Sequence, residues 1–309
     1  MKPTSPLLRS TPPSASFARL AVSLGVAATA VFAQAQAQTS AQTPAQTPAQ
    51  AQAQTPVLAV TPVMEKLRGP WDLAFAPDGA MLYTEKCHGL WVRLPDGSTR
   101  HLFGTDGAAL AAPDIFCQGQ SGVHGVAIDP SFAQGQRRIY VFLASNLQTN
   151  PRGNRVVRLD VGLDWKTVSK RTDIVADIAF KDARRVGGPG AHSGGRIRFG
   201  PDGYLWVTTG DNHDPGLPQD PERLGGKVLR VDVDGRAAPG NNAPPGFDAR
   251  IYSYGLRNAQ GIAFRPAGQP GAGQAFTTES LRRQQVASQP QRIDAFDLTL
   301  ASGQKTTLN

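Results

Sequence analysis

Three polar segments of this 309-residue chain contain side chains that could move a proton or bind an anion. They hold Gln120, His192 and the adjacent pair Arg257 and Asn258. A histidine can be neutral near pH 7 and then accept a proton from a hydroxyl group. An arginine stabilises an anion or a developing oxyanion. Together these residue types indicate removal of a proton from a hydroxyl group, with stabilisation of the resulting negative charge.

Each of these residues also has a purely structural interpretation. His192 could hydrogen-bond the backbone of its own glycine-rich loop, and Arg257 could form a salt bridge between neighbouring sheets. Gln120 alone indicates little. All three segments, however, directly precede an apolar strand pattern. If those strands occupy the same place in successive sheets, their loops should converge on one face.

The segment around His192 also resembles two other motifs. Ala191 to Gly195 fits a relaxed nucleophile elbow with Ser193 as nucleophile, but that elbow needs a strand before the serine and a helix after it. Here Ser193 follows the loop 187–190 and precedes a strand. The same glycines do not open a helix, as a dinucleotide fingerprint must. The sequence therefore disfavours a serine hydrolase and a dinucleotide site.

The elements that must position these residues repeat along the chain. Four segments combine an apolar strand, a turn containing proline and a second apolar strand, at 73–84, 126–142, 197–208 and 262–278. Their prolines are 53, 71 and 65 residues apart. Pro-Asp-Gly, present in two of them, is a strong turn signal. Further strand patterns follow the first three hairpins, at 90–94, 155–159 and 227–231.

A recurring hairpin at this spacing is typical of four-stranded propeller blades with variable loops. A sandwich or a barrel also uses short strands, but it does not predict recurrence of one hairpin motif. The composition, with 33 Gly and 25 Pro, agrees with a loop-rich β protein. We therefore predict an all-β fold, a β-propeller with about four blades present.

The net charge of +8 does not indicate a nucleic-acid partner. Much of it lies at the two ends, in Lys2, Arg9 and Arg19 and in the basic tail. A nucleic-acid surface needs a concentrated basic stripe with interleaved aromatic residues, and the sequence shows none. No nucleic-acid partner is expected.

The N-terminal 60 residues are predicted to lie outside the folded body. Residues 1–37 are typical of a secretory signal, with basic residues up to Arg19, an apolar run and small residues at a cleavage site. The apolar run is too short to span a bilayer, so no stable membrane insertion is expected. Residues 38–60 form an Ala/Gln/Thr/Pro repeat and are predicted to be a disordered linker. The protein is therefore expected to be exported, to the periplasm or beyond the cell.

The two cysteines, Cys87 and Cys117, are 30 residues apart in the predicted body. In an exported protein they could form one disulfide, and the alternative is two buried free thiols. Neither belongs to a Cys-x-x-Cys pair, so a metal site is not indicated.

The body, at about residues 62–279, resembles the soluble glucose/sorbosone dehydrogenase family. Members are six-bladed propellers that use pyrroloquinoline quinone (PQQ) with Ca²⁺. The resemblance lies in four segments, in chain order 117–126, 191–211, 226–235 and 252–261.

The resemblance implies roles for the residues above. His192 matches the general base, which takes the C1 hydroxyl proton of an aldose sugar as hydride moves to PQQ and a lactone forms. Arg257 matches the arginine that polarises the quinone oxygen, Asn258 a quinone contact, and Gln120 a residue lining the site. A sugar substrate and an electron acceptor are thus the implied partners. In many relatives an acidic residue precedes the base, whereas Ala191 stands there in this chain.

The chain departs from the family pattern after Pro266. The family's acidic-His-Gly-Pro loop, whose carbonyl groups help to bind Ca²⁺, and the Asp-Glu pair after it have no counterpart. Residues 280–309 are interpreted as a divergent tail, from a truncated or frameshifted reading frame, in place of the last two family blades. No metal ligand is assigned.

The expectation is a PQQ-dependent sugar dehydrogenase by descent, with impaired or absent activity. The alternative is a non-catalytic propeller fragment that binds a carbohydrate or a protein. A calcium-dependent lactone or ester hydrolase is disfavoured, because its acidic ligand set is not evident.

Overall fold

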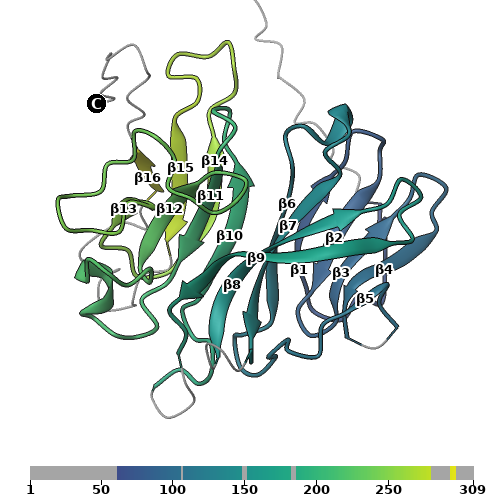
Figure 1. Ribbon diagram of the computed structural model, residues 1–309, viewed down its shortest axis with the longest axis horizontal. Helices are drawn as coiled ribbons and strands as arrows, with labels where there is room; N and C mark the ends of the chain where they lie inside the picture. The colour runs from purple at the N-terminus through teal and green to yellow at the C-terminus, as the bar shows by residue number, and fades with distance from the viewer. Residues whose placement is uncertain (1–60, 106, 148–151, 182–185, 280–292, 297–309) are drawn as a thin grey trace, which may run out of the picture. The chain divides into compact units, whose positions relative to one another are not determined.

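Each of the four hairpins predicted from the sequence forms the first two strands of one β-sheet. The computed structural model describes residues 61–105, 107–147, 152–181, 186–279 and 293–296. In the four sheets, strands that follow one another in the chain are hydrogen-bonded neighbours, and all pairs are antiparallel except β4–β5. This is the meander expected of propeller blades (Figure 1).

The elements of the first two sheets are β1 (Pro70–Phe75), β2 (Met81–Glu85), β3 (Gly89–Arg93), β4 (Thr99–Gly104) and β5 (Leu110–Ala111), then β6 (Val123–Ile128), η1 (Phe132–Gln134), β7 (Arg138–Ser145), β8 (Gly153–Val161) and β9 (Val168–Ile178). Those of the last two are β10 (Gly194–Phe199), β11 (Leu205–Thr209), η2 (Leu217–Gln219), β12 (Lys227–Val231) and β13 (Ile251–Tyr254), then β14 (Ala259–Phe264), β15 (Ala275–Glu279) and β16 (Ile293–Phe296).

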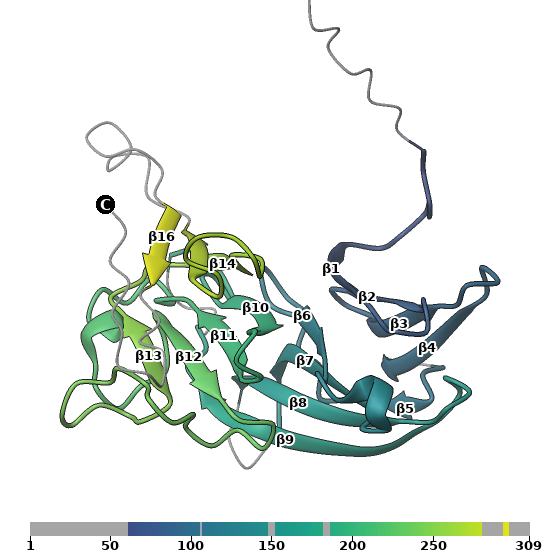
Figure 2. The ribbon, with the colours of Figure 1, turned by 90° about the horizontal axis from the view of Figure 1, so that it is seen from above.

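The first strands of successive sheets lie against one another. β6 contacts β1 on one side and β10 on the other, and β10 contacts β14. Figure 2 shows the sheets following each other in chain order, from purple through green to yellow. The prediction of propeller blades is confirmed by this arrangement.

Apolar side chains fill the spaces between neighbouring sheets. One cluster joins the first and second sheets, and includes Leu82 and Val126. A second joins the second and third, with Tyr140 and Ile197, and a third joins the third and fourth around Trp206. Burial of these faces against each other is the main stabilising term of such a fold.

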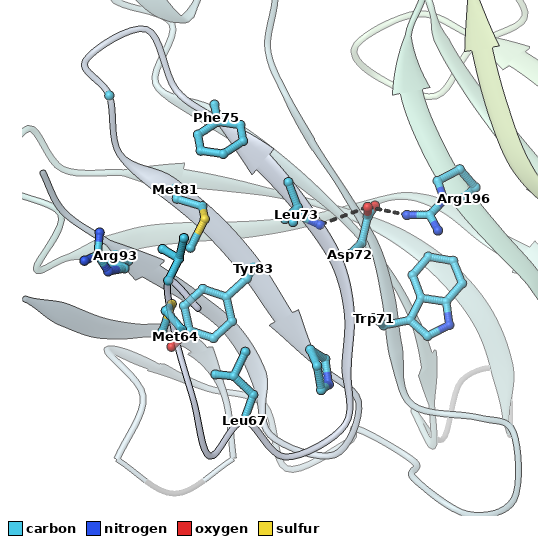
Figure 3. Close-up of a pocket in the computed structure, with 13 residues that line it drawn as sticks. Met64, Leu67, Trp71, Asp72, Leu73, Phe75, Met81, Tyr83, Arg93 and Arg196 are labelled. Carbon is cyan, nitrogen blue, oxygen red and sulfur yellow. Dashed lines mark hydrogen bonds and ion pairs between the residues drawn. The ribbon is translucent and has the colours of Figure 1, made fainter. Parts of the chain in front are cut away.

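The face of β1 that points away from β6 is different. Leu73 is 52% exposed and Phe75 is 67% exposed. A cavity of about 760 Å³ lies along this face and is lined mainly by apolar side chains of β1, β2 and the segment before them, with Arg196 at one end (Figure 3). The described part of the chain places no sheet over these two side chains.

The sequence did not predict every strand. β16 lies inside the segment interpreted as a divergent tail, and it pairs with β15 as the third strand of the fourth sheet. The predicted signal at 1–37, the linker at 38–60 and the rest of the tail lie outside the described residues. Within the described ranges, no helix is long and apolar enough to cross a membrane.

Candidate active site

The loop before β10 and the turn after β11 bring together His192 and Asp211. The hairpin β10–β11 ends at the pair Gly194 and Thr209, so the residues just beyond it face each other. The Nδ1 atom of His192 lies 2.6 Å from Oδ1 of Asp211. This contact favours the tautomer with its proton on Nδ1, which leaves Nε2 as the acceptor.

The backbone segments at His192 and Gly210 approach each other closely. His192 has φ of +55°, a left-handed conformation that is uncommon for residues other than glycine. A Cβ atom on Gly210 would lie 1.9 Å from the His192 carbonyl oxygen, so only glycine fits there. The close approach of these two segments fixes the direction from which Asp211 reaches the imidazole ring.

Asp211 is held in its ionised form. Burial acts to raise the pKa of its carboxyl group, but hydrogen bonds from the His192 ring and the His213 N–H, with the nearby charge of Arg257, lower it below its usual range. An ionised carboxylate on Nδ1 stabilises the imidazolium that forms when Nε2 takes up a proton. The pair therefore has the geometry and the charge of a general base with its orienting group.

The other sequence-predicted residues surround this pair. The Oε1 atom of Gln120 accepts a hydrogen bond of 3.3 Å from the His192 N–H, and Oδ1 of Asn258 accepts one of 3.0 Å from the Gly194 N–H. The carbonyl oxygen of Arg257 accepts a bond of 2.7 Å from the Asp211 N–H. The structure thus brings the loops before β6, β10 and β14 together, as their matching positions predict.

Gln120 and Asn258 also hold the backbone of the site. Gln120 uses its Oε1 to hold backbone, so its contribution here is to fix the loop of His192. Asn258 uses its Oδ1 in the same way, which leaves Nδ2 as the group able to donate to a ligand. The backbone N–H of Arg257 donates to the carboxylate of Glu279, at the end of β15, which is a contact within the fourth sheet and not the salt bridge between sheets considered from the sequence.

Sequence reasoning missed four residues of the site: Lys181, Asp211, Asn212 and His213. Asp211 does for His192 what an acidic residue directly before it would do, and it lies 19 positions away in sequence. The only signal for it was its place at the end of a strand, inside a segment quoted for the resemblance. Lys181 follows β9, and its Nζ donates a bond of 3.2 Å to the Asn212 carbonyl oxygen.

The Asn212 side chain is an orphan. Among the described residues neither its Oδ1 nor its Nδ2 has a hydrogen-bond partner, although Asn212 is only 6% exposed. A buried amide without partners costs free energy unless a ligand or a water satisfies it. Its backbone N–H donates to the His192 carbonyl oxygen, so this amide lies beside the proposed base.

A disulfide fixes the loop that carries Gln120. Cys87, between β2 and β3, is bonded to Cys117, with Cα atoms 5.3 Å apart, and this confirms the predicted bridge. The neighbouring Lys86 donates from Nζ to the Gly119 carbonyl oxygen. The first sheet thereby anchors the segment that contacts the backbone of His192.

The family model described as Glucose / Sorbosone dehydrogenase matches residues 67–277, which is more than half of the chain. The chain belongs to this family.

Similar members of the family are named as sugar dehydrogenases. "Aldose sugar dehydrogenase YliI" of Escherichia coli is 32% identical over 209 residues, covering 66% of this chain and 52% of that protein. The PQQ-bound aldose sugar dehydrogenase of Streptomyces coelicolor is 30% identical with a TM-score of 0.57, covering 70% of this chain and 58% of that one. The apo-form of the soluble aldose sugar dehydrogenase of Escherichia coli is 28% identical with a TM-score of 0.59, covering 72% and 60%. The chain spans about half the length of the curated relatives it matches.

The site fits one end of a quinone cofactor. PQQ carries three carboxylates and a quinone, and it needs cations and hydrogen-bond donors. Lys181 and Arg257 bring positive charge near His213, whose ring stacks on His192, and the orphan amide of Asn212 adds a hydrogen-bonding group. Within the residues that the structure describes, no group of three or more His, Cys, Asp or Glu side chains could hold a metal ion, so no residue is assigned to Ca²⁺.

Proposed function

We propose that this chain is a PQQ-dependent oxidoreductase that oxidises the C1 hydroxyl of an aldose sugar to a lactone, with His192 as general base. The observation that carries the proposal is the contact of 2.6 Å between His192 Nδ1 and Asp211 Oδ1. It leaves Nε2 to accept a proton, in a chain whose family and named relatives are sugar dehydrogenases.

The chain's own residues account for the proton and the charge. The C1 hydroxyl proton moves to Nε2 of His192, and the Asp211 carboxylate stabilises the resulting imidazolium. Arg257 provides a positive charge for an anionic oxygen of the ligand, and Asn258 provides its Nδ2 as a donor. PQQ, when bound, would supply the two-electron acceptor for the hydride that leaves C1. Loss of the hydroxyl proton and of the C1 hydride converts the C1 hydroxyl group of the cyclic sugar to the carbonyl group of a lactone.

The test is turnover by the full chain with added PQQ and Ca²⁺. Reduction of an artificial electron acceptor would be followed with several aldoses. We expect His192→Ala to lower kcat by about 10²-fold to 10⁴-fold, the range for loss of a general base. Asp211→Asn should also lower kcat, because it removes the charge that stabilises the imidazolium. His101→Ala, which changes a histidine of the first sheet, is the matched control and should keep its activity.

The second candidate is a non-catalytic propeller fragment that binds a carbohydrate or a protein. The cationic side chains near His213 are Lys181 and Arg257, two charges where PQQ would bring three carboxylates, and this imbalance among the described residues favours it. The turnover assay and a melting curve with added PQQ decide between the two candidates. If the full chain shows no turnover and PQQ does not raise its melting temperature, the enzyme proposal is overturned and the fragment is supported.

We also propose export, to the periplasm or beyond the cell, from the predicted signal at 1–37. The proposed dehydrogenase would also use a sugar as substrate, an electron acceptor and Ca²⁺. Expression with and without residues 1–37, followed by cell fractionation, tests the location.

A further inference from the structure

His213 lies with its ring flat against the ring of His192. The two centroids are 3.6 Å apart and the planes differ by 19°. His213 also donates its backbone N–H to Oδ1 of Asp211, at 2.8 Å, the same oxygen atom that lies 2.6 Å from His192 Nδ1. One carboxylate oxygen therefore ties the backbone of His213 and the ring of His192 to each other.

The loop before His192 leaves room for this stack. Gly187 has φ of +96°, and a Cβ atom there would lie 2.7 Å from Nε2 of His213. The His213 ring therefore contacts the Gly187 backbone as well as the His192 ring. A larger residue at 187 would move His213.

A stack of this kind supplies a restraint that the hydrogen bond lacks. The bond to Asp211 fixes the direction of the Nδ1 atom, but the ring can still tilt about that bond, because χ2 of histidine has a broad energy minimum. A flat neighbour at van der Waals distance blocks the tilt. Nε2, at the far side of the ring, moves most when the ring tilts.

Burial and most of the charges around the stack favour a neutral His213. Lys181, at the end of β9, and Arg257, in the loop before β14, lower the pKa of His213, whereas Asp211, on the same turn, acts to raise it. Burial and the charges of His192 and Lys181 lower the pKa of His213 below its usual value. At neutral pH the neighbour of His192 is therefore an uncharged ring, which does not repel an imidazolium.

We propose that His213 is a positioning residue for His192, which holds the ring so that Nε2 meets the substrate hydroxyl. The assignment rests on the proposed function for the meaning of that position. The stacking itself can be tested on the protein without PQQ.

The first experiment is NMR of the full chain, selectively labelled on its five histidines. Stacking displaces the His192 ring-proton signals by the ring current of His213. We expect His213→Leu to abolish this displacement and His213→Phe to retain one, because phenylalanine restores a flat ring. His101→Leu is the matched control, since His101 stacks on Trp91 at 4.0 Å in the first sheet and should leave His192 unchanged. Unchanged His192 signals in folded His213→Leu would overturn the proposal.

The second experiment separates kcat from KM under the turnover assay. His213→Leu should lower kcat by about 10-fold to 100-fold with KM unchanged, as expected when a reacting group is misplaced by up to an ångström. His213→Phe should restore most of kcat. Equal kcat for His213→Leu and the unchanged protein would overturn the positioning role.

A further variant guards against misfolding of His213→Leu. Gly187→Ala keeps His213 but places a methyl group 2.7 Å from its Nε2 and 2.9 Å from the Cβ of Ala191, and should shift the His192 signals in the same direction, with a matching shift of the His213 signals that shows the ring itself has moved. An absence of any shift in this folded variant would count against the stack. If the unchanged protein shows no turnover at all, the proposed function fails, whereas the NMR result still decides the contact between the two rings.

Discussion

Strands β1 and β10 begin equivalent hairpins, yet the same face is exposed in β1 and buried in β10. In both, aliphatic or aromatic residues stand two and four positions before the turn proline, Leu73 and Phe75 in β1 and Ile197 and Phe199 in β10. Ile197 is fully buried and Phe199 packs on Tyr140 with ring centroids 5.1 Å apart. Leu73 and Phe75 are mostly exposed. The hairpin is thus specified locally, whereas burial depends on the sheet that stands in front of it.

The same two positions in β6 and β14 support this explanation. Val126 packs in the cluster with the first sheet, and Ile262 in the cluster with the third. In every sheet but the first, these positions face the preceding sheet. The β1 face therefore carries the pattern of a buried surface without a described sheet over it, and the apolar cavity in Figure 3 lies there.

The largest expected effect tests the two faces directly. Ile197→Ala should lower the free energy of unfolding by about 2–5 kcal/mol, because it leaves a cavity in a packed core. The equivalent Leu73→Ala should cost about 0.5 kcal/mol or less, as for a surface residue. Urea unfolding of both variants provides the measurement. Equal costs would mean that Leu73 is covered in solution, and the contrast between the faces would fail.

The disulfide gives the next test, because it ties the sheet with the exposed face to its neighbour. Replacing both Cys87 and Cys117 with alanine should cost about 2–4 kcal/mol, the usual value for a bridge of this span. Hydrogen exchange should increase more in β1–β4 than in β10–β13. Uniform loss of protection in both sheets would show that the first sheet does not depend on the bridge more than the third.

The boundary between β1 and β6 should respond to acid through His124. This ring lies between Trp71 of β1, at 4.7 Å, and Phe142, at 5.8 Å. Burial lowers the pKa of His124 from 6.5 to about 4. Between pH 6.5 and 4 the unfolded chain binds the proton and the folded one does not, so stability falls as the pH falls, by about 3 kcal/mol in all.

The variant His124→Phe isolates this contribution. It keeps a flat ring between Trp71 and Phe142 and removes the titration, so its unfolding free energy should depend less on pH over that interval. His101, whose pKa is also lowered by burial, remains in both proteins and supplies a common background. Parallel pH curves for the two proteins would contradict the assignment to His124.

The smallest expected effect on stability is that of Phe75→Lys. A surface substitution should change the free energy of unfolding by about 0.5 kcal/mol or less. It should nevertheless reduce self-association at high concentration, because it interrupts an exposed apolar patch. Sedimentation velocity, with Leu163→Lys as a control at a residue that is 84% exposed elsewhere, measures this. Equal self-association of the two variants would show that the β1 face does not mediate self-association.

The contrast also explains how much the sequence could predict. The hairpins followed from local patterns, since Pro-Asp-Gly turns and alternating strands act over a few residues. The meeting of Gln120, His192 and Asn258 followed from their matching places before three strands. Burial of Ile197 and exposure of Phe75 could not follow, because identical patterns have different neighbours.

Other features were missed for similar physical reasons. The pairing of His192 with Asp211 depends on two loops that approach through glycine, and the stacking of His213 depends on a left-handed turn at the same place. Strand β16 follows a segment with no strand signal and gains its partner only from β15. Lys227 is fully buried with three carbonyl partners, from Leu217, Pro218 and Gly225, a use of lysine that composition does not indicate.

The carboxylate of Asp72 has a consequence for how the chain folds in time. It accepts a hydrogen bond of 3.0 Å from the Val126 N–H and two of 2.7 Å from Arg198, which lies 126 positions later. A ribosome adds about 5–20 residues per second, so Arg198 follows Asp72 by roughly 6–25 s. During that interval β1 can already join β2 and β6, but its buried carboxylate still lacks the cations of Arg196 and Arg198. The contact between β1 and the third sheet therefore forms last, and a chain that pauses before Arg196 holds an unneutralised carboxylate on β1.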